Sequence, residues 1–273
     1  MIDFKEKIVA ITGAARGIGK TIAERFAQQG AHVFVCDRDQ AAGEALVESL
    51  RTAGHQADLV HVNLASPGEP ERMIQEICGK AGRLNILINN ARSGTRVPFL
   101  QETDASWEAG MSVTLKAAFF ASQEATKRMR DTGGGAILNI SSVAAHLVTH
   151  ESSSYHIAKA AMVQMTRHMA ASAGKYGVRV NCICPGFIVQ DEHRERFDAD
   201  DNATYRAQAE HCHPLGAVGS ASDVAEACLF LCSTGARFIT GEVMMLDGGA
   251  TLNEQFCMLR DFVTRETSGA KNA

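Results

Sequence analysis

Seven short apolar segments rich in β-branched residues recur along the chain with helical patterns between them, and this alternation most constrains the fold. A helical stripe of Ile18, Ile22 and Phe26 ends at Gly30. Strands joined through helices require right-handed crossovers, so we expect an α/β fold with a doubly wound parallel sheet of about seven strands and helices on both faces. The strand segments are 7–12, 32–37, 57–64, 84–91, 135–142, 178–185 and 242–247, and further helical patterns lie at about 41–53, 70–81, 104–131, 153–175 and 222–233.

The length and net charge of the chain limit the number of domains and the classes of partner that we expect. The chain has 273 residues, of which 45% are apolar, and we expect one domain over 1–273. Its formal net charge is −4, without a long run of either sign, which argues against a nucleic-acid or membrane-surface protein. No apolar stretch approaches the ~20 residues of a membrane span, and the charged N-terminus does not resemble a signal peptide. The sequence therefore predicts a cytoplasmic protein.

The eight cysteines predict neither disulfides nor a metal site. Five of them lie in apolar runs, as reduced core thiols do, and no C-x-x-C pair is present. The five are Cys36, Cys182, Cys184, Cys228 and Cys232.

The stretch "TGAARGIG", residues 12–19, follows the first predicted strand and opens the first predicted helix. Glycines in this context permit a tight turn and let a dinucleotide pyrophosphate approach the helix N-terminus. Asp37 ends the second strand, where a carboxylate accepts hydrogen bonds from the adenosine ribose and repels a 2′-phosphate. Arg16 and Arg38 favour the phosphate instead. We give the carboxylate more weight, so NAD is expected over NADP.

Tyr155 and Lys159 are four residues apart and share one face of a predicted helix. A free phenol has a pKa near ~10, and a neighbouring ammonium lowers it, which suits the phenol for acid–base catalysis. Ser142 ends the fifth strand and can supply a hydroxyl to the substrate oxygen.

These motifs resemble, in order and spacing, the classical short-chain dehydrogenase/reductase family. The resemblance runs from about residue 3 to 252 and is carried by "TGAARGIG", "NNA" (89–91), Ser142, "YHIAK" (155–159), "NCICPG" (181–186) and "TGEVMMLDGG" (240–249). It implies a Rossmann-type fold, a homotetramer or homodimer, and reversible hydride transfer between the nicotinamide and a carbinol or carbonyl carbon. It also implies that Tyr155 is the acid/base, that Lys159 lowers its pKa and binds the nicotinamide ribose, and that Ser142 orients the substrate oxygen.

The cofactor contacts expected from these motifs come from loops at one edge of the sheet. They are Gly13, Arg16, Gly17, Ile18, Gly19, Asp37, Asn63, Leu64, Asn90, Ala91, Tyr155, Lys159, Pro185, Gly186 and Ile188.

Four positions depart from the family pattern. Thr114 replaces an asparagine that supports a proton relay from the lysine, which puts the relay in doubt. Asn63 replaces an acidic residue near the adenine. Arg92 replaces the glycine after "NNA" and brings a cation to the edge of the expected site. Gln190 replaces a threonine that contacts the carboxamide.

The leading hypothesis is an oxidoreductase of the EC 1.1.1.- class that transfers a hydride between NAD(H) and a secondary alcohol or carbonyl of a small polar substrate, such as a sugar, polyol or sugar acid. The alternatives are an NADPH-dependent carbonyl or 3-oxoacyl-type reductase of the same family and, from another class, a non-catalytic dinucleotide-binding regulator. An extended sugar-nucleotide epimerase fits poorly, because no room is left for a second domain.

Substrate contacts are expected from the loops around the site. The charged segment 187–215 intrudes between the last two strands, as a lid or binding element does, although a solvated helix face explains its charges as well. Arg92, together with Arg96, is expected to meet an anionic substrate group, and the alternative is an arginine that points to solvent. His150 and Gln190 complete the expected substrate contacts. Residues 254–273 form a C-terminal extension with no assigned role.

Overall fold

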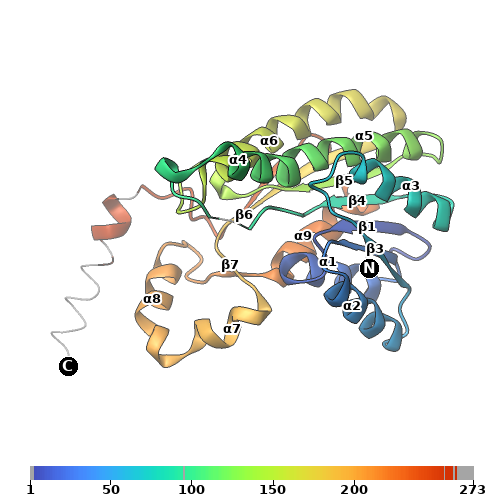
Figure 1. Ribbon diagram of the computed structural model, residues 1–273. Helices are drawn as coiled ribbons and strands as arrows, with labels where there is room; N and C mark the ends of the chain where they lie inside the picture. The colour runs from blue at the N-terminus through green and yellow to red at the C-terminus, as the bar shows by residue number, and fades with distance from the viewer. Residues whose placement is uncertain (1–2, 95, 255, 261, 263–273) are drawn as a thin grey trace.

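The sheet has seven parallel strands in the order β3-β2-β1-β4-β5-β6-β9 (Figure 1). The computed structural model describes residues 3–94, 96–254, 256–260 and 262. Every strand predicted from the sequence is present, and the parallel doubly wound sheet is confirmed. The strands are β1 (Ile8–Thr12), β2 (His32–Asp37), β3 (Ala57–His61), β4 (Ile86–Asn89), β5 (Gly135–Ile140), β6 (Val178–Pro185) and β9 (Val243–Leu246).

Helices cover both faces of the sheet (Figure 1). One apolar core lies between the sheet and α1, α2 and α9, and includes Phe26, Leu46 and Val224. A second core lies on the opposite face, against α3, α5 and α6, and includes Met73 and Met129. The helices on the first face are α1 (Gly17–Gln28), α2 (Gln40–Thr52) and α9 (Ala221–Cys232), and those on the second are α3 (Glu69–Ala81), α4 (Asp104–Met111), α5 (Ala117–Arg130) and α6 (Ser153–Ala173).

Burial explains why the apolar strand segments lack an alternating pattern. All five residues of β1 are buried, because helices cover this strand on both sides. The five cysteines expected in the core are buried and form no disulfide. None of the described helices is long and apolar enough to cross a membrane.

The strand order reverses between β1 and β4, so the loops after these strands diverge at the carboxyl edge of the sheet. In open α/β sheets the crevice at such a switch point is where ligands bind. Thr12, the last residue of β1, bridges it: its Oγ1 accepts hydrogen bonds from the backbone N–H groups of Asn90 at 3.0 Å and Ala91 at 3.1 Å. These bonds tie the start of the loop after β4 to the end of β1.

The helix predicted over 104–131 contains a π-helical turn, Ser112–Lys116, between α4 and α5. Such turns insert one residue into a helix and often lie at functional sites. Just before it, Gly110 lets α4 approach α6, because a Cβ there would lie 2.6 Å from Ser154 Oγ. The close contact fixes the start of α6, which carries Tyr155.

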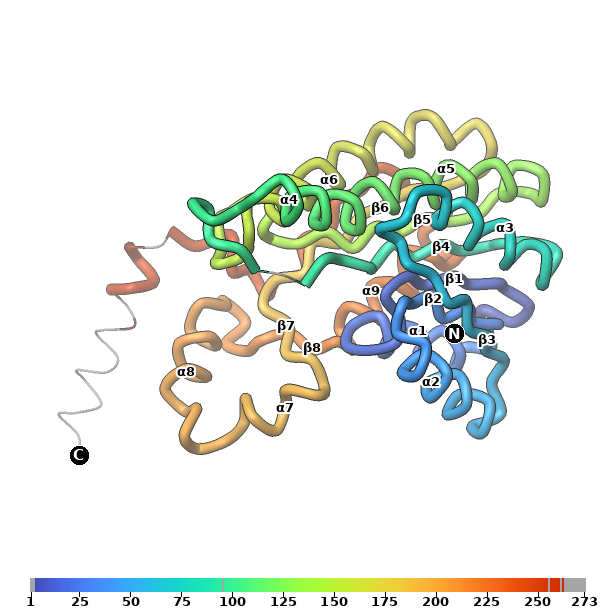
Figure 2. Tube along the Cα trace, viewed as in Figure 1, coloured from blue at the N-terminus to red at the C-terminus, as the bar shows by residue number. Residues whose placement is uncertain are grey.

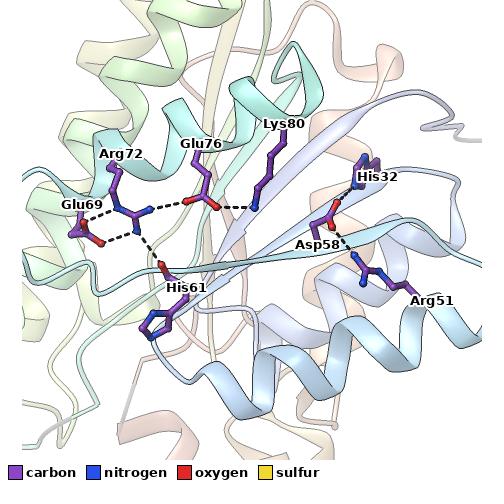
Figure 3. Close-up of polar contacts among 8 residues, drawn as sticks. All are labelled: His32, Arg51, Asp58, His61, Glu69, Arg72, Glu76 and Lys80. Atoms are coloured by element: carbon purple, nitrogen blue, oxygen red, sulfur yellow. Dashed lines mark hydrogen bonds and ion pairs between the residues drawn. The ribbon is translucent and has the colours of Figure 1, made fainter.

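Charged side chains fasten the β3 edge of the sheet (Figure 3). Arg72 on α3 pairs with Glu69 and Glu76, each at 2.7 Å, and its Nη2 donates to the carbonyl of His61 at 3.0 Å. A second group gathers at Asp58. The Arg72 contacts hold α3 against the end of β3, and the Asp58 contacts tie β3 to β2 and α2.

The segment 187–215 folds into two helices below the sheet edge (Figure 2). It begins with β7 (Ile188–Val189), which pairs in parallel with β8 (Gly219–Ser220), and contains α7 (Asp191–Asp198) and α8 (Ala203–His211). Phe187, Phe197 and Tyr205 form a small aromatic cluster with ring centroids 6.1–6.4 Å apart. Most of α7 is exposed, in accord with the solvated-face interpretation.

The C-terminal extension, 254–273, is described only at 254, 256–260 and 262. There it lies beside the end of α8, where His211 Nε2 is 2.9 Å from the carbonyl oxygen of Met258. The rest of the extension lies outside the described residues.

A buried polar network joins the central strands to α5 and α6. Asn89 Nδ2 on β4 donates to Ser122 Oγ on α5 at 2.9 Å and to Asn139 Oδ1 on β5 at 2.8 Å. Asn139 Nδ2 donates in turn to Thr166 Oγ1 on α6 at 2.9 Å. Asn139 therefore connects the layer that carries Tyr155 to the strand that leads into the switch point.

Replacing Asn139 with Leu should lower the free energy of unfolding by about 1–3 kcal/mol, the cost of leaving buried hydrogen-bonding groups without this partner. Urea unfolding of the variant and the wild type measures the difference. Asn253→Leu, at an exposed position, is the matched control and should change stability little. Equal stabilities of the Asn139 variant and the wild type would show that the network is not a structural support.

Candidate active site

The loop between β1 and α1 has glycines where its backbone lies closest to neighbouring segments at the switch point. Gly13 has φ 63°, and a Cβ there would lie 2.9 Å from the Cα of Ala91. A Cβ on Gly19 would lie 2.2 Å from the carbonyl oxygen of Gly13. Side chains at these positions would fill the space that the pyrophosphate of a dinucleotide needs at the N-terminus of α1. The loop fits such a cofactor.

Asn90 braces this loop from β4. Its Nδ2 donates to the carbonyl oxygens of Thr12 and Gly13, both at 3.0 Å. The asparagine of "NNA" therefore holds the glycine loop against the neighbouring strand. Ala91, the next residue, sets how close Gly13 can approach.

The end of β2 carries the charges that bear on cofactor choice. Asp37 Oδ2 accepts a hydrogen bond from the backbone N–H of Ala15 at 3.0 Å, so the carboxylate lies beside the glycine loop. Arg16 forms an ion pair with Asp39. Arg38 is exposed. Of the two arginines that favour a 2′-phosphate, one is thus already bound to a carboxylate of the chain.

Ser142, Tyr155 and Lys159 come together at the carboxyl end of β5. Ser142 precedes a short 3-10 turn, Val143–Ala145, and lies close enough to Tyr155 to lower the pKa of its phenol. Lys159 lies one helical turn after the tyrosine, and its Nζ is 5.6 Å from the centre of the Tyr155 ring. The three side chains share one site, as the sequence predicted.

Two contacts place the first turn of α6. The side chain of the N-cap residue Ser152 accepts from Ser154 Oγ at 3.3 Å but makes no capping hydrogen bond to a backbone N–H of the helix. Glu102 takes that part: its carboxylate accepts from the backbone N–H of Ser154 at 3.3 and 3.4 Å. Burial raises the pKa of Glu102, but the hydrogen bonds from Ser153 and Ser154 outweigh it and lower the pKa. The negative charge suits a helix N-terminus.

The pKa of Tyr155 is raised in the protein chain itself, which differs from the lowering expected from the sequence. Burial of the phenol raises it and outweighs the Ser142 hydrogen bond and the positive charges of Arg92 and Arg96, which lower it. The physical reason is that a phenolate loses its hydration in this half-buried position.

Lys159 is 2% exposed, and its Nζ donates to the carbonyl oxygen of Ile140 at 2.5 Å. Burial lowers its pKa to about 8, with a smaller contribution in the same direction from Arg92. The amine therefore changes protonation state close to neutral pH, which suits a group that exchanges protons with its surroundings.

Of the expected substrate residues, Arg92 lies at the site. Its guanidinium carbon lies over the Tyr155 ring, 5.6 Å from the ring centre. Arg96 pairs with Glu151 at 2.7 Å. His150 is exposed on the loop that leads to α6.

Gln190 lies against the cofactor loop: a Cβ on Gly17 would be 2.3 Å from its Oε1. Gly186 packs on Asp247, and Pro185 is buried at the end of β6. The remaining cofactor positions are Ile18 at the start of α1, Asn63 and Leu64 just after β3, and Ile188 on β7.

Thr114 is buried in the π-helical turn, and its Oγ1 accepts a hydrogen bond from the backbone N–H of Ser93 at 3.3 Å. The hydroxyl therefore holds the loop that follows "NNA". This contact gives the threonine a structural task beside the relay role implied by the resemblance.

Several contributing residues carried no signal in the sequence. Glu102 caps α6 from a position 52 residues away. Glu151 forms an ion pair with Arg96, and nothing in the sequence around Glu151 indicates this contact. His146 Nε2 lies 3.8 Å from Cys184 Sγ. The hydrogen bond from Cys182, followed by that from His146, lowers the pKa of the Cys184 thiol against the effect of burial.

A glycine loop at the switch point, with half-buried Tyr155 and buried Lys159 beside it, is typical of oxidoreductases that use a nicotinamide dinucleotide. The chain belongs to the short-chain dehydrogenase/reductase family: the family model described as enoyl-(acyl carrier protein) reductase matches residues 13–251.

Relatives extend over nearly the whole chain. A probable galactose dehydrogenase of Rhizobium meliloti is 33% identical over 90% of this chain and 96% of its own length. The cis-4-hydroxycyclohexanecarboxylate dehydrogenase of Sinomonas cyclohexanicum is 32% identical over 91% and 98%. The solved structure of a short-chain type dehydrogenase/reductase from Mycobacterium ulcerans has a TM-score of 0.84 at 26% identity, covering 92% of both chains.

Burial of Lys159 predicts a characteristic pH dependence of stability. Between about pH 8 and pH 10.5 the unfolded chain holds a proton on this lysine that the folded chain has released. Unfolding free energy should therefore rise with pH in this window, and Lys159→Met should remove that rise.

Urea unfolding at several pH values measures the slope for wild type and variant. The slope is the readout, because the lost hydrogen bond to Ile140 shifts stability by an amount that does not vary with pH. Lys175→Met, at an exposed lysine, should keep the wild-type slope. Parallel curves for wild type and the Lys159 variant would contradict the shifted pKa.

Proposed function

We propose that this protein is an NAD-dependent dehydrogenase that reversibly oxidises the secondary alcohol of a small polar substrate to a carbonyl. The observation that carries the proposal is the grouping of Ser142, Tyr155 and Lys159 beside the glycine loop, with Lys159 Nζ 5.6 Å from the centre of the Tyr155 ring. A family fold alone does not define a reaction, but this group of side chains matches the chemistry of proton removal from a carbinol.

In this proposal each residue has a defined role. Ser142 holds the substrate oxygen, and Tyr155 takes the hydroxyl proton in oxidation and returns it in reduction. Lys159 supplies positive charge beside the phenol and donates to the cofactor ribose. The glycine loop and Asp37 would hold the nicotinamide cofactor, which would supply the acceptor for the hydride of the carbinol carbon.

Protonation of the tyrosine must be reversed in each turnover. Because the pKa of Lys159 is lowered to about 8, this amine can pass a proton on near neutral pH. Thr114 contacts Ser93 rather than completing a chain by itself. We therefore assign the first transfer to Lys159 and leave Thr114 as the brace of the neighbouring loop.

The preference for NAD rests on Asp37 and on the ion pair of Arg16 with Asp39. The pair neutralises one of the cations that would otherwise attract a 2′-phosphate. The names of the relatives, one for galactose and one for a hydroxycyclohexane carboxylic acid, support a small hydroxylated substrate. In keeping with the family we also propose a cytoplasmic homotetramer, or homodimer, in which 1–273 is one domain.

The second candidate is an NADPH-dependent carbonyl or 3-oxoacyl-type reductase. The description of the family model, an acyl carrier protein reductase, favours it, as does the exposed Arg38 at the end of β2. The non-catalytic regulator is less well supported, because Ser142, Tyr155 and Lys159 are all in place.

The deciding experiment measures the absorbance of the reduced nicotinamide with NAD and with NADP. The substrates are galactose, gluconate, acetoin, cis-4-hydroxycyclohexanecarboxylate and short polyols, and the reverse reaction is tested with a 3-oxoacyl thioester. Oxidation of a small alcohol with NAD supports the proposal. Turnover of the thioester alone with NADPH would establish the second candidate, and binding without turnover would favour the regulator.

Replacing Tyr155 with Phe should lower kcat by about 10²–10⁴, the range for loss of a general acid/base. NAD affinity should be nearly unchanged, because the glycine loop and Asp37 remain. Steady-state kinetics and cofactor titration give the two values. An active Phe variant would exclude Tyr155 as the proton acceptor.

Asp37→Ser should narrow or invert the preference for NAD over NADP, measured as the ratio of kcat/KM values. Removing the carboxylate ends its repulsion of the 2′-phosphate and leaves Arg38 free to approach it. Asp58→Ser on the neighbouring strand β3 is the control and should keep the wild-type ratio. A wild type that already prefers NADP would show that the arginines outweigh Asp37.

A further inference from the structure

Arg92 places a cation at the reacting end of the site. Its guanidinium carbon lies 5.6 Å from the centre of the Tyr155 ring, the same distance as Lys159 Nζ. The side chain is exposed, whereas Lys159 is 2% exposed. The two cations therefore differ in access: only Arg92 can meet a solvent-borne molecule directly.

The two arginines of this loop differ in their partners. Arg96 pairs with Glu151 at 2.7 Å, and burial of the carboxylate side chain, 17% exposed, strengthens that contact. For Arg92 no ion pair is present within the described residues; its Nη1 donates to the carbonyl oxygen of Ser93 at 3.3 Å. One unit of positive charge thus remains uncompensated beside Tyr155.

The backbone around Arg92 is held on both sides. Ala91 N–H donates to Thr12 Oγ1 at 3.1 Å, and Ser93 N–H donates to Thr114 Oγ1 at 3.3 Å. The cation–π contact with the tyrosine ring adds a further interaction that favours this position of the guanidinium. A cation that is already positioned loses less conformational entropy when it binds an anion.

We propose that Arg92 binds a carboxylate of the substrate, so that the substrate is a hydroxy acid and the product the corresponding oxo acid. This inference rests on the proposed function and names its substrate class. A planar guanidinium matches a carboxylate with two parallel hydrogen bonds. A phosphate dianion would call for more positive charge than a single arginine supplies, because Arg96 is occupied by Glu151.

A different role is open to the same residue. The positive charge of Arg92 lowers the pKa of Tyr155 against the effect of burial. If that were its only task, Arg92 would act on every substrate alike and not on those with a carboxylate. Acids and their amides have similar shapes and differ in charge, so they separate the two roles.

Binding is tested first, with unreactive probes. Cyclohexanecarboxylate and cyclohexanecarboxamide are titrated by calorimetry into the full-length protein saturated with NADH. The variants are Arg92→Gln, Arg92→Lys and the control Arg237→Gln, an exposed arginine after α9. We expect Arg92→Gln to weaken carboxylate binding by about tenfold or more, near the lower end of a charged hydrogen bond. Carboxamide binding and the Arg237 variant should stay at wild-type values.

Turnover is tested second. The ratio of kcat/KM for cis-4-hydroxycyclohexanecarboxylate to that for its amide should exceed one in the wild type and fall by about tenfold in Arg92→Gln. Arg92→Lys should recover part of the ratio, because it keeps the charge but loses the paired hydrogen bonds.

The outcomes distinguish the two proposals. Equal losses for acid and amide, with a shifted pH profile for both, would overturn the carboxylate site and leave Arg92 a modulator of Tyr155. A wild type that oxidises alcohols but prefers the amide would overturn it as well, while the proposed dehydrogenase stands. Selective carboxylate binding that depends on Arg92, without turnover of any alcohol, would support the anion site and reject the proposed reaction.

Discussion

The hydroxyl of Thr12 is the contact on which the site depends, because it joins the ends of the two strands that flank the switch point. It accepts from the N–H groups of Asn90 and Ala91 and so fixes β4 against β1. In the other direction, the side-chain amide of Asn90 donates hydrogen bonds to the carbonyl oxygens of Thr12 and Gly13. The glycine loop and the loop that carries Arg92 therefore share one anchor, and cofactor and substrate positions are set together.

The chemistry of the site follows from burial more than from the pairing of charges. Burial raises the pKa of Tyr155 and lowers that of Lys159, so both groups are moved toward their neutral forms. Nearby positive charge lowers the pKa of the Tyr155 phenol and so opposes the effect of burial. Arg92 and Arg96 supply part of it, and Glu151, which pairs with Arg96, acts in the opposite direction on the pKa of Tyr155.

The sequence was sufficient for the sheet, its parallel order and the grouping of Ser142, Tyr155 and Lys159. Strands buried on both faces leave apolar runs, and a glycine loop between strand and helix leaves a motif, so both can be recognised. A solvated helix face was expected within 187–215, but the bounds of α7 could not be predicted, because Phe197 is its only buried residue and gives no periodicity. The difference between Arg92 and Arg96 depends on Glu151, a partner 55 residues from Arg96 along the chain. The direction of the Tyr155 pKa depends on burial, which local spacing does not reveal.

The aromatic cluster of Phe187, Phe197 and Tyr205 gives the inserted helices a nucleus of their own, apart from the two cores that flank the sheet. A short parallel pair, β7 with β8, attaches this unit to the body of the protein. The unit also touches the body of the protein where Gln190 meets Gly17 and where His213 and Pro214 lie against Gly248 and Gly249. A transfer of the inserted helices to another α/β framework would therefore have to keep two sets of backbone contacts, one at the glycine loop and one after β9.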